Sequence, residues 1–319
     1  MKKQNLLKLA LMMVAMVFMT GAMAQVTQIN HTNDVATGTN YVEATDNTYQ
    51  TVGIGLRLYV RPDATYSPSY DGTGNAGTGL NANSQWRWVS GATYATGTQV
   101  KAATNENWVT LLPTEIPAAN ATTTFWVLES NTSFSCVGAP TSHIVSGVAT
   151  PTADIAGQGN SWDIVTAGTS FRRCATGADI GDIINVALTE TGAPAAAQFY
   201  TFGISVEQQA LDANLVAIGG STTDVTGTYG VAATAGTLTA GLAQTRTIPA
   251  LPLIDPSTPT QYTFTLTANS IYSNISIRSQ LRGGIAVPTG YTGAATTITY
   301  TLLPVPTTGP IFHIPNNFL

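Results

Sequence analysis

The sequence is short of charge, and above all of basic residues. Lys and Arg number 12 and Asp and Glu 17 among 319 residues, so charged residues make up 9% of the chain, against about a quarter in an ordinary soluble domain. So few cations leave no patch that could hold a phosphate backbone, which argues against nucleic acid as a partner. The surface is instead rich in Thr, Ala, Gly and Ser and costs little to desolvate, which favours packing against copies of the same chain. The alternative is a neutral exported domain with short side chains.

Catalytic motifs are also missing. The three histidines, His31, His143 and His313, belong to no zinc-binding pattern. The sequence contains no Gly-x-Ser-x-Gly elbow and no phosphate-binding loop, and its carboxylates are scattered. We therefore predict that the protein is not an enzyme and needs no cofactor.

The first 24 residues have the pattern of a secretory signal. Lys2, Lys3 and Lys8 accompany the apolar run LALMMVAMVFMT, and Ala-Met-Ala precedes Gln25. The apolar run is shorter than the ~20 residues that span a bilayer, so we expect a secreted chain with no membrane span after cleavage. Residues 25–319 keep 9 basic and 17 acidic residues, a net charge of −8.

Cysteine is nearly absent too. Cys136 and Cys174 are the two cysteines, an even count in a chain expected to be exported to an oxidising compartment. We predict that they form a disulfide. The alternatives are two free thiols or a link between subunits.

Strict alternation of apolar and small or polar residues recurs after Gln25, over 52–60, 200–206, 262–266 and 298–302. A period of two indicates strands with one buried face, and the intervening Gly-, Asn- and Pro-rich stretches are typical of antiparallel sandwiches. The best candidate for a helix is 206–218, VEQQALDANLVAI. We predict an all-β fold of two antiparallel β-sandwich domains.

The domain boundaries follow from composition. We place the division near ATPTAD, which gives one domain over 40–148 and a second over 149–304. Residues 25–39 form a polar N-terminal arm. Residues 305–319 form a C-terminal arm, interrupted by prolines yet ending in apolar residues.

The C-terminal arm is a candidate for assembly. Ile311, Phe312, Ile314 and Phe318 would expose much apolar surface, which favours docking in a groove of the same or a neighbouring molecule. The alternative is an arm folded back on its own domain.

Two further kinds of site can be named. Asp179 with Asp182, and Asp71 in its glycine-rich loop, are weak candidates for calcium; ordinary turn residues explain them more simply, because calcium needs six to eight oxygens. Trp86 and Trp88 share one strand face and could stack on a sugar ring; the alternative is core packing.

Trp86 and Trp88, the turn SGATYATGT, the strand Thr122–Leu128 and Cys136 follow one another in 84–148. This order resembles the Ig-like modules repeated in large secreted proteins of the Bacteroidetes. The stretch PIFHIPNNF is similar to the opening of a gliding-motility-type sorting region of the same group. The resemblance implies Ig-like sandwiches at the surface or outside a Gram-negative cell, where such modules are usually spacers, adhesins or assembly units.

These observations converge on a secreted, self-associating structural subunit of an extracellular filament, sheet or surface coat, with copies of itself as its partners. The alternative is a monomeric surface adhesin or glycan-binding module.

Overall fold

The computed structural model describes residues 47–69, 79–158, 162–174, 183–194, 198–236, 238–293 and 297–306. The fold is nearly all β with antiparallel sheets, which confirms the predicted class. Both predicted arms, apart from 305–306, lie outside the described residues, as do Asp71, Asp179 and Asp182. No helix within these ranges is long and apolar enough to cross a bilayer.

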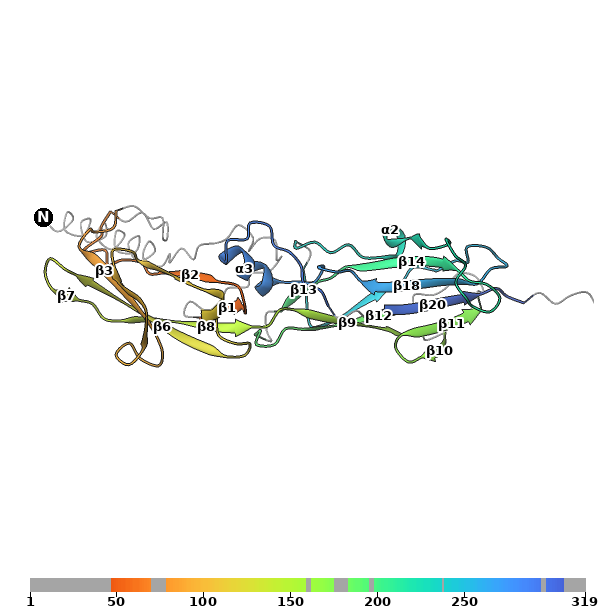
Figure 1. Cartoon of the computed structure of the whole chain (residues 1–319), viewed down its shortest axis with the longest axis horizontal. Coiled ribbons are helices and arrows are strands. Elements are labelled where there is room, and N and C mark those ends of the chain that lie inside the picture. The colour runs from red at the N-terminus through yellow and green to blue at the C-terminus, as the bar shows by residue number, and fades with distance from the viewer. Residues whose placement is uncertain are drawn as a thin grey trace, which may run out of the picture. The chain divides into compact units, whose positions relative to one another are not determined.

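The described residues divide into two compact units (Figure 1). Unit 1 comprises Arg57–Leu111 and Thr123–Ile144. Unit 2 comprises 47–56, Leu112–Thr122 and the described part of 145–306. The chain thus passes between the units four times, and the domain boundary near residue 149 stays a prediction.

Most strands of unit 1 belong to a six-stranded sheet in the order β1-β8-β6-β3-β4, with β7 paired to β6, and β2 and β5 form a separate pair. Its core includes Trp86 and Trp88 of β3, together with Phe125 and Val127 of β6. The strands are β2 (Leu56–Tyr59), β3 (Ser84–Ser90), β4 (Thr98–Thr104), β5 (Trp108–Leu111), β6 (Thr122–Asn131), β7 (Cys136–Val137) and β8 (Thr141–Val148), whose last residues belong to unit 2.

Unit 2 holds two facing sheets. The wider one has the order β10-β11-β20-β18-β14-β15, in which β11 and β20 are parallel, and the narrower one has the order β17-β12-β9. The strands of these sheets are β9 (Thr152–Gln158), β10 (Asp163–Thr166), β11 (Ser170–Cys174), β12 (Ile183–Thr189), β14 (Ile204–Ala210), β15 (Thr223–Asp224), β17 (Ala243–Thr247), β18 (Thr260–Leu266) and β20 (Thr297–Leu303).

The remaining elements of unit 2 are short. They are β1 (Asn47–Thr51), the sheet formed by β16 (Thr239–Ala240), β13 (Phe199–Thr201) and β19 (Tyr272–Ser273), the turn η2 (Pro113–Glu115), and the helices α2 (Thr226–Tyr229) and α3 (Asn274–Arg282).

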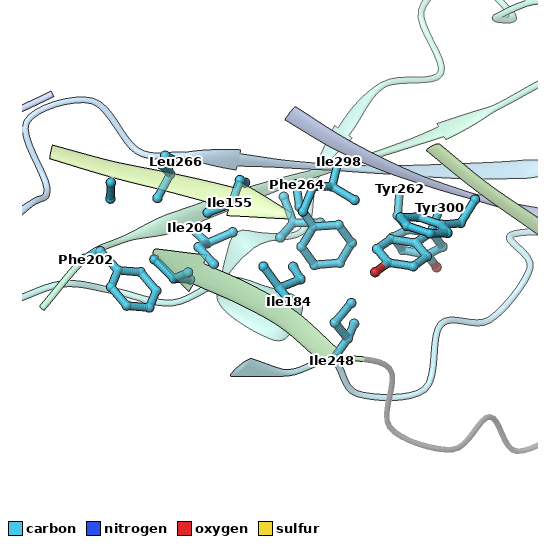
Figure 2. Close-up of a cluster of buried hydrophobic side chains, with 14 of the residues drawn as sticks. Ile155, Ile184, Phe202, Ile204, Ile248, Tyr262, Phe264, Leu266, Ile298 and Tyr300 are labelled. Carbon is cyan, nitrogen blue, oxygen red and sulfur yellow. The ribbon is translucent and has the colours of Figure 1, made fainter. Parts of the chain in front are cut away.

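An apolar core lies between the two facing sheets of unit 2 (Figure 2). Alternate residues of β18 and β20 point inward, as the period of two predicted for 262–266 and 298–302. Tyr300 is central: its ring stacks on Phe171 at a centroid distance of 5.0 Å and meets the edges of Trp162 and Phe264 at 5.0 and 5.7 Å. Aromatic pairs in these arrangements add ~1 kcal/mol each beyond the area they bury.

Two local predictions are corrected. The helical interpretation of 206–218 is wrong: β14 runs to Ala210, and a bridge between Leu211 and Ala217 closes a turn. The alternation over 52–60 is not one strand, because Val52 and Gly53 form a turn in which Gly53 has φ of +84°.

We expect Gly157→Ala to destabilise unit 2. A Cβ at this position of β9 would overlap the Phe171 ring and lie 2.7 Å from the Tyr300 hydroxyl, and overpacking a core costs ~1–3 kcal/mol. Gly219→Ala is the matched control, because a Cβ there meets nothing within 4 Å. Urea unfolding measures both variants, and equal midpoints would show that the ring pair can move aside.

Candidate functional site

A cleft of about 420 Å³ opens between the two sheets of unit 2. Its floor is formed by Ile184, Ile204, Ile248 and Phe264, which are all at least 96% buried and are labelled in Figure 2. Its size lies within the ~300–1,000 Å³ typical of ligand sites in proteins.

The cleft has two different walls. On one side lie Tyr229, which ends α2, and Val231, which pairs with Ile204 of β14. On the other side lie Thr245 and Arg246 of β17. The cleft therefore lies where the edge of the narrow sheet faces the wide one.

Arg246 brings a cation to the cleft, whose lining also includes Thr228, Thr245 and Thr247. Its guanidinium carbon lies 5.1 Å from the centre of the Phe202 ring, and its Nε is buried without a hydrogen-bond acceptor among the described residues. Among the described residues no carboxylate forms an ion pair with Arg246. A buried donor without an acceptor costs ~1–3 kcal/mol, which an incoming oxygen would remove.

A second polar site surrounds α3, whose helix is unusual because nearly all of it is buried. Ser273 caps it by accepting a hydrogen bond from the Ser276 N–H, and the Ser276 hydroxyl accepts one from the Ser273 N–H. Reciprocal caps of this kind satisfy donors that a helix end leaves free.

Strand β1 is held against α3 by polar contacts. The Gln50 amide donates to the Ser279 carbonyl, and the Thr51 N–H donates to the Ser279 hydroxyl at 2.8 Å. Arg282 donates to the Tyr49 carbonyl. These bonds join segments about 230 residues apart in sequence.

Glu190 is the buried acid of this region. The Ser273 hydroxyl donates to one of its oxygens at 2.6 Å and the Tyr200 hydroxyl to the other at 3.1 Å. Burial raises the pKa of Glu190 to about 7, although both hydrogen bonds act to lower it. The same burial, with the nearby carboxylate, raises the pKa of Tyr200. Glu190, Ser273 and Tyr200 therefore form a buried hydrogen-bonded group.

Trp86 and Trp88 are not among the residues that line the cleft. Trp86 and Trp88 are 0% and 2% exposed, so they are core residues and neither offers a ring face to a sugar. Trp108 has Lys101 and Arg57 within 4.5 Å of its ring centre. Within the described ranges, no group of three or more His, Cys, Asp or Glu could hold a metal ion.

The predicted disulfide is not present. Cys136 and Cys174 are both free and exposed, the first on β7 of unit 1 and the second at the end of β11 of unit 2.

The sequence analysis missed Arg246 and Glu190. Arg246 alternates with threonines in AQTRT, as an outward residue of an ordinary strand would. Its inward direction depends on the pairing of β17 with β12, which places Arg246 opposite Ile184. Glu190 follows β12 in a polar stretch, and no local signal marks it as buried.

The pKa of Glu190 predicts that stability falls as pH rises. The folded protein binds this proton more tightly than the unfolded chain, whose Glu has an ordinary pKa of 4.5. The contribution of Glu190 to stability is therefore fully present below pH 4.5 and falls by roughly 3 kcal/mol as pH approaches 7. We expect Glu190→Gln to flatten this slope in urea unfolding between pH 4.5 and 8. Exposed Glu207→Gln is the control, and parallel profiles for all three proteins would contradict the assignment.

No protein-family model matches the chain, and no curated protein does. Among solved structures it is similar to the FN1-FN3 domains of chicken CNTN1, at 10% identity and a TM-score of 0.26, covering 81% of this chain and 62% of that one. It is also similar to the C-terminal domain of the AgI/II polypeptide BspA of Streptococcus agalactiae, at 7% identity and a TM-score of 0.23, covering 82% and 96%. A third is the CFA/I adhesin CfaE of enterotoxigenic E. coli, at 8% identity and a TM-score of 0.19, covering 84% and 100%. The chain thus spans less than two thirds of the length of the CNTN1 chain. Because all three TM-scores are low, the all-β assignment depends on the observed sheets.

Proposed function

We propose that the chain is a secreted, self-associating structural subunit of an extracellular filament, sheet or surface coat. Its two all-β units supply strand edges that pair between copies, and its C-terminal arm docks on a neighbour. The chemistry is non-covalent, and no catalytic step is involved.

The observation that carries this proposal is the apolar edge of the wide sheet in unit 2. Strand β10 lies at that edge, and all four of its residues are exposed. Two of them, Ile164 and Val165, are 63% and 55% exposed. Natural proteins usually protect such an edge with lysine, proline or a covering loop, because it is a template for another strand.

The low charge of the surface supports the same proposal. A net charge of −8 over residues 25–319 is carried by few groups, and apolar side chains such as Phe134 and Val287 are more than 70% exposed. A surface of this kind is cheap to desolvate when copies pack together.

The chain from Gln25 to Leu319 should assemble as its concentration rises. Negative-stain electron microscopy and sedimentation velocity over a concentration series measure this. Monodisperse particles throughout would favour the monomeric adhesin or glycan-binding module, which a glycan array then tests.

The double variant Ile164→Lys, Val165→Lys should assemble at least about tenfold more weakly, because lysines at a strand edge oppose pairing by charge and desolvation. Val287→Lys is the control: it adds charge at an exposed apolar residue that lies outside every strand. Equal loss in both would mean that net charge alone governs assembly.

Deleting residues 305–319 should leave a folded protein that assembles poorly. The deletion begins after β20 ends at Leu303 and so keeps the buried residues of that strand. Circular dichroism tests folding and sedimentation tests assembly. Normal assembly by the truncated chain would remove Ile311, Phe312, Ile314 and Phe318 from the proposal.

A further inference from the structure

The outer edge of β17 has no partner strand among the described residues. In the narrow sheet, within that part of the chain, β17 pairs with β12 alone. The Leu188 N–H donates to the Leu242 carbonyl at 2.7 Å, one step before β17 begins. Hydrogen-bonded pairs alternate along an antiparallel ladder, so the backbone groups of Gln244 and Arg246 face β12. Those of Ala243, Thr245 and Thr247 face away.

This open edge borders the cleft. Thr245 and Thr247 line the cleft beside Arg246, so an added strand would pair with their outward N–H and carbonyl groups. Alternate side chains of that strand would enter the apolar floor over Ile204 and Phe264. Its carbonyl oxygens would supply the acceptor that the buried Nε of Arg246 lacks.

A segment of the chain outside the described residues has the right pattern for this place. Residues 307–319 would span up to ~43 Å when extended. Within them, Ile311–Ile314 is a run of four residues between Pro310 and Pro315, short enough to pair with the five residues of β17. In a strand Phe312 and Ile314 share one face, and flanking prolines are tolerated at the ends of an edge strand.

The proposed self-association makes a second copy the source of this segment. Ile298 of β20 lies opposite Phe264 at the cleft, whereas Leu302 lies opposite Thr260, four residues further along. Strand β20 therefore runs ~13 Å past Phe264 before it ends.

We propose that the cleft beside β17 receives Ile311–Ile314 of a neighbouring copy, which adds as a fourth strand to the narrow sheet and places Phe312 and Ile314 over Ile204 and Phe264. This assignment rests on the proposed self-association and gives it a head-to-tail contact that repeats from copy to copy.

The first test is Thr245→Pro in the chain from Gln25 to Leu319. Proline removes one outward N–H and leaves the ladder to β12 intact. We expect a folded protein that assembles at least about tenfold more weakly, with the sedimentation profile of the chain lacking 305–319. Thr245→Val keeps the N–H and should assemble like the parent.

The second test leaves unit 2 unchanged, which guards against a folding defect. The double variant Phe312→Ser, Ile314→Ser should prevent assembly, and it changes only the arm. Mixed in equal amounts, the Thr245→Pro and the arm variant should form discrete heterodimers, because one supplies an intact arm and the other an intact cleft.

The outcomes separate the two proposals. Parent-like assembly of Thr245→Pro, or the absence of heterodimers in the mixture, overturns the cleft assignment and leaves self-association standing. A parent chain that stays monomeric at every concentration overturns both.

Discussion

The rings of Phe171 and Tyr300 in the wide sheet of unit 2 pack closely against Gly157 of β9 in the narrow sheet, and the unequal width of those sheets determines the rest. Six strands face three, so the narrow sheet cannot cover the whole inner face of the wide one. The inner face of β14 is covered instead by Val225, Tyr229 and Val231. The junction between this cover and β17 is where the cleft lies. The cleft is thus a direct consequence of strand count.

The helix α3 is stabilised by hydrogen bonds to its buried polar side chains. This helix buries asparagine, serine, arginine and glutamine side chains, which apolar burial alone would disfavour. The cost is offset by hydrogen bonds to backbone groups, such as the Gln50 amide on the Ser279 carbonyl. The hydrogen bonds between β1 and α3 join segments about 230 residues apart in sequence, so they close a very long loop. We expect these bonds to form late in folding.

The strands with strict alternation could be predicted from sequence, because one face of each is fully buried. Tyr262, Phe264 and Leu266 show this best. The helix α3 could not, since NISIRSQLR has little apolar periodicity and its environment comes from β1. The spacing of Trp86 and Trp88, two residues apart, predicts that they share a face of the strand. Their burial depends on the strand that packs over them. The cleft has no sequence signal, because it depends on which strand becomes the edge.

Arg246 explains how an open edge can be selective. An inward-pointing charge on an edge strand is one of the devices that prevent indiscriminate strand addition, because any strand that covers it must also satisfy it. Strand β10 has other features of a protected edge: it is short, it carries the exposed Asp163, and its register shifts between Ile164 and Thr166. The edges of β10 and β17 would therefore differ in kind, because only β17 asks its partner for apolar side chains that fill the cleft and an oxygen for Arg246. A partner that leaves Arg246 without an acceptor pays a free-energy cost, and such a cost gives specificity without greater affinity. A subunit that must assemble in one register needs that specificity more than it needs tight binding.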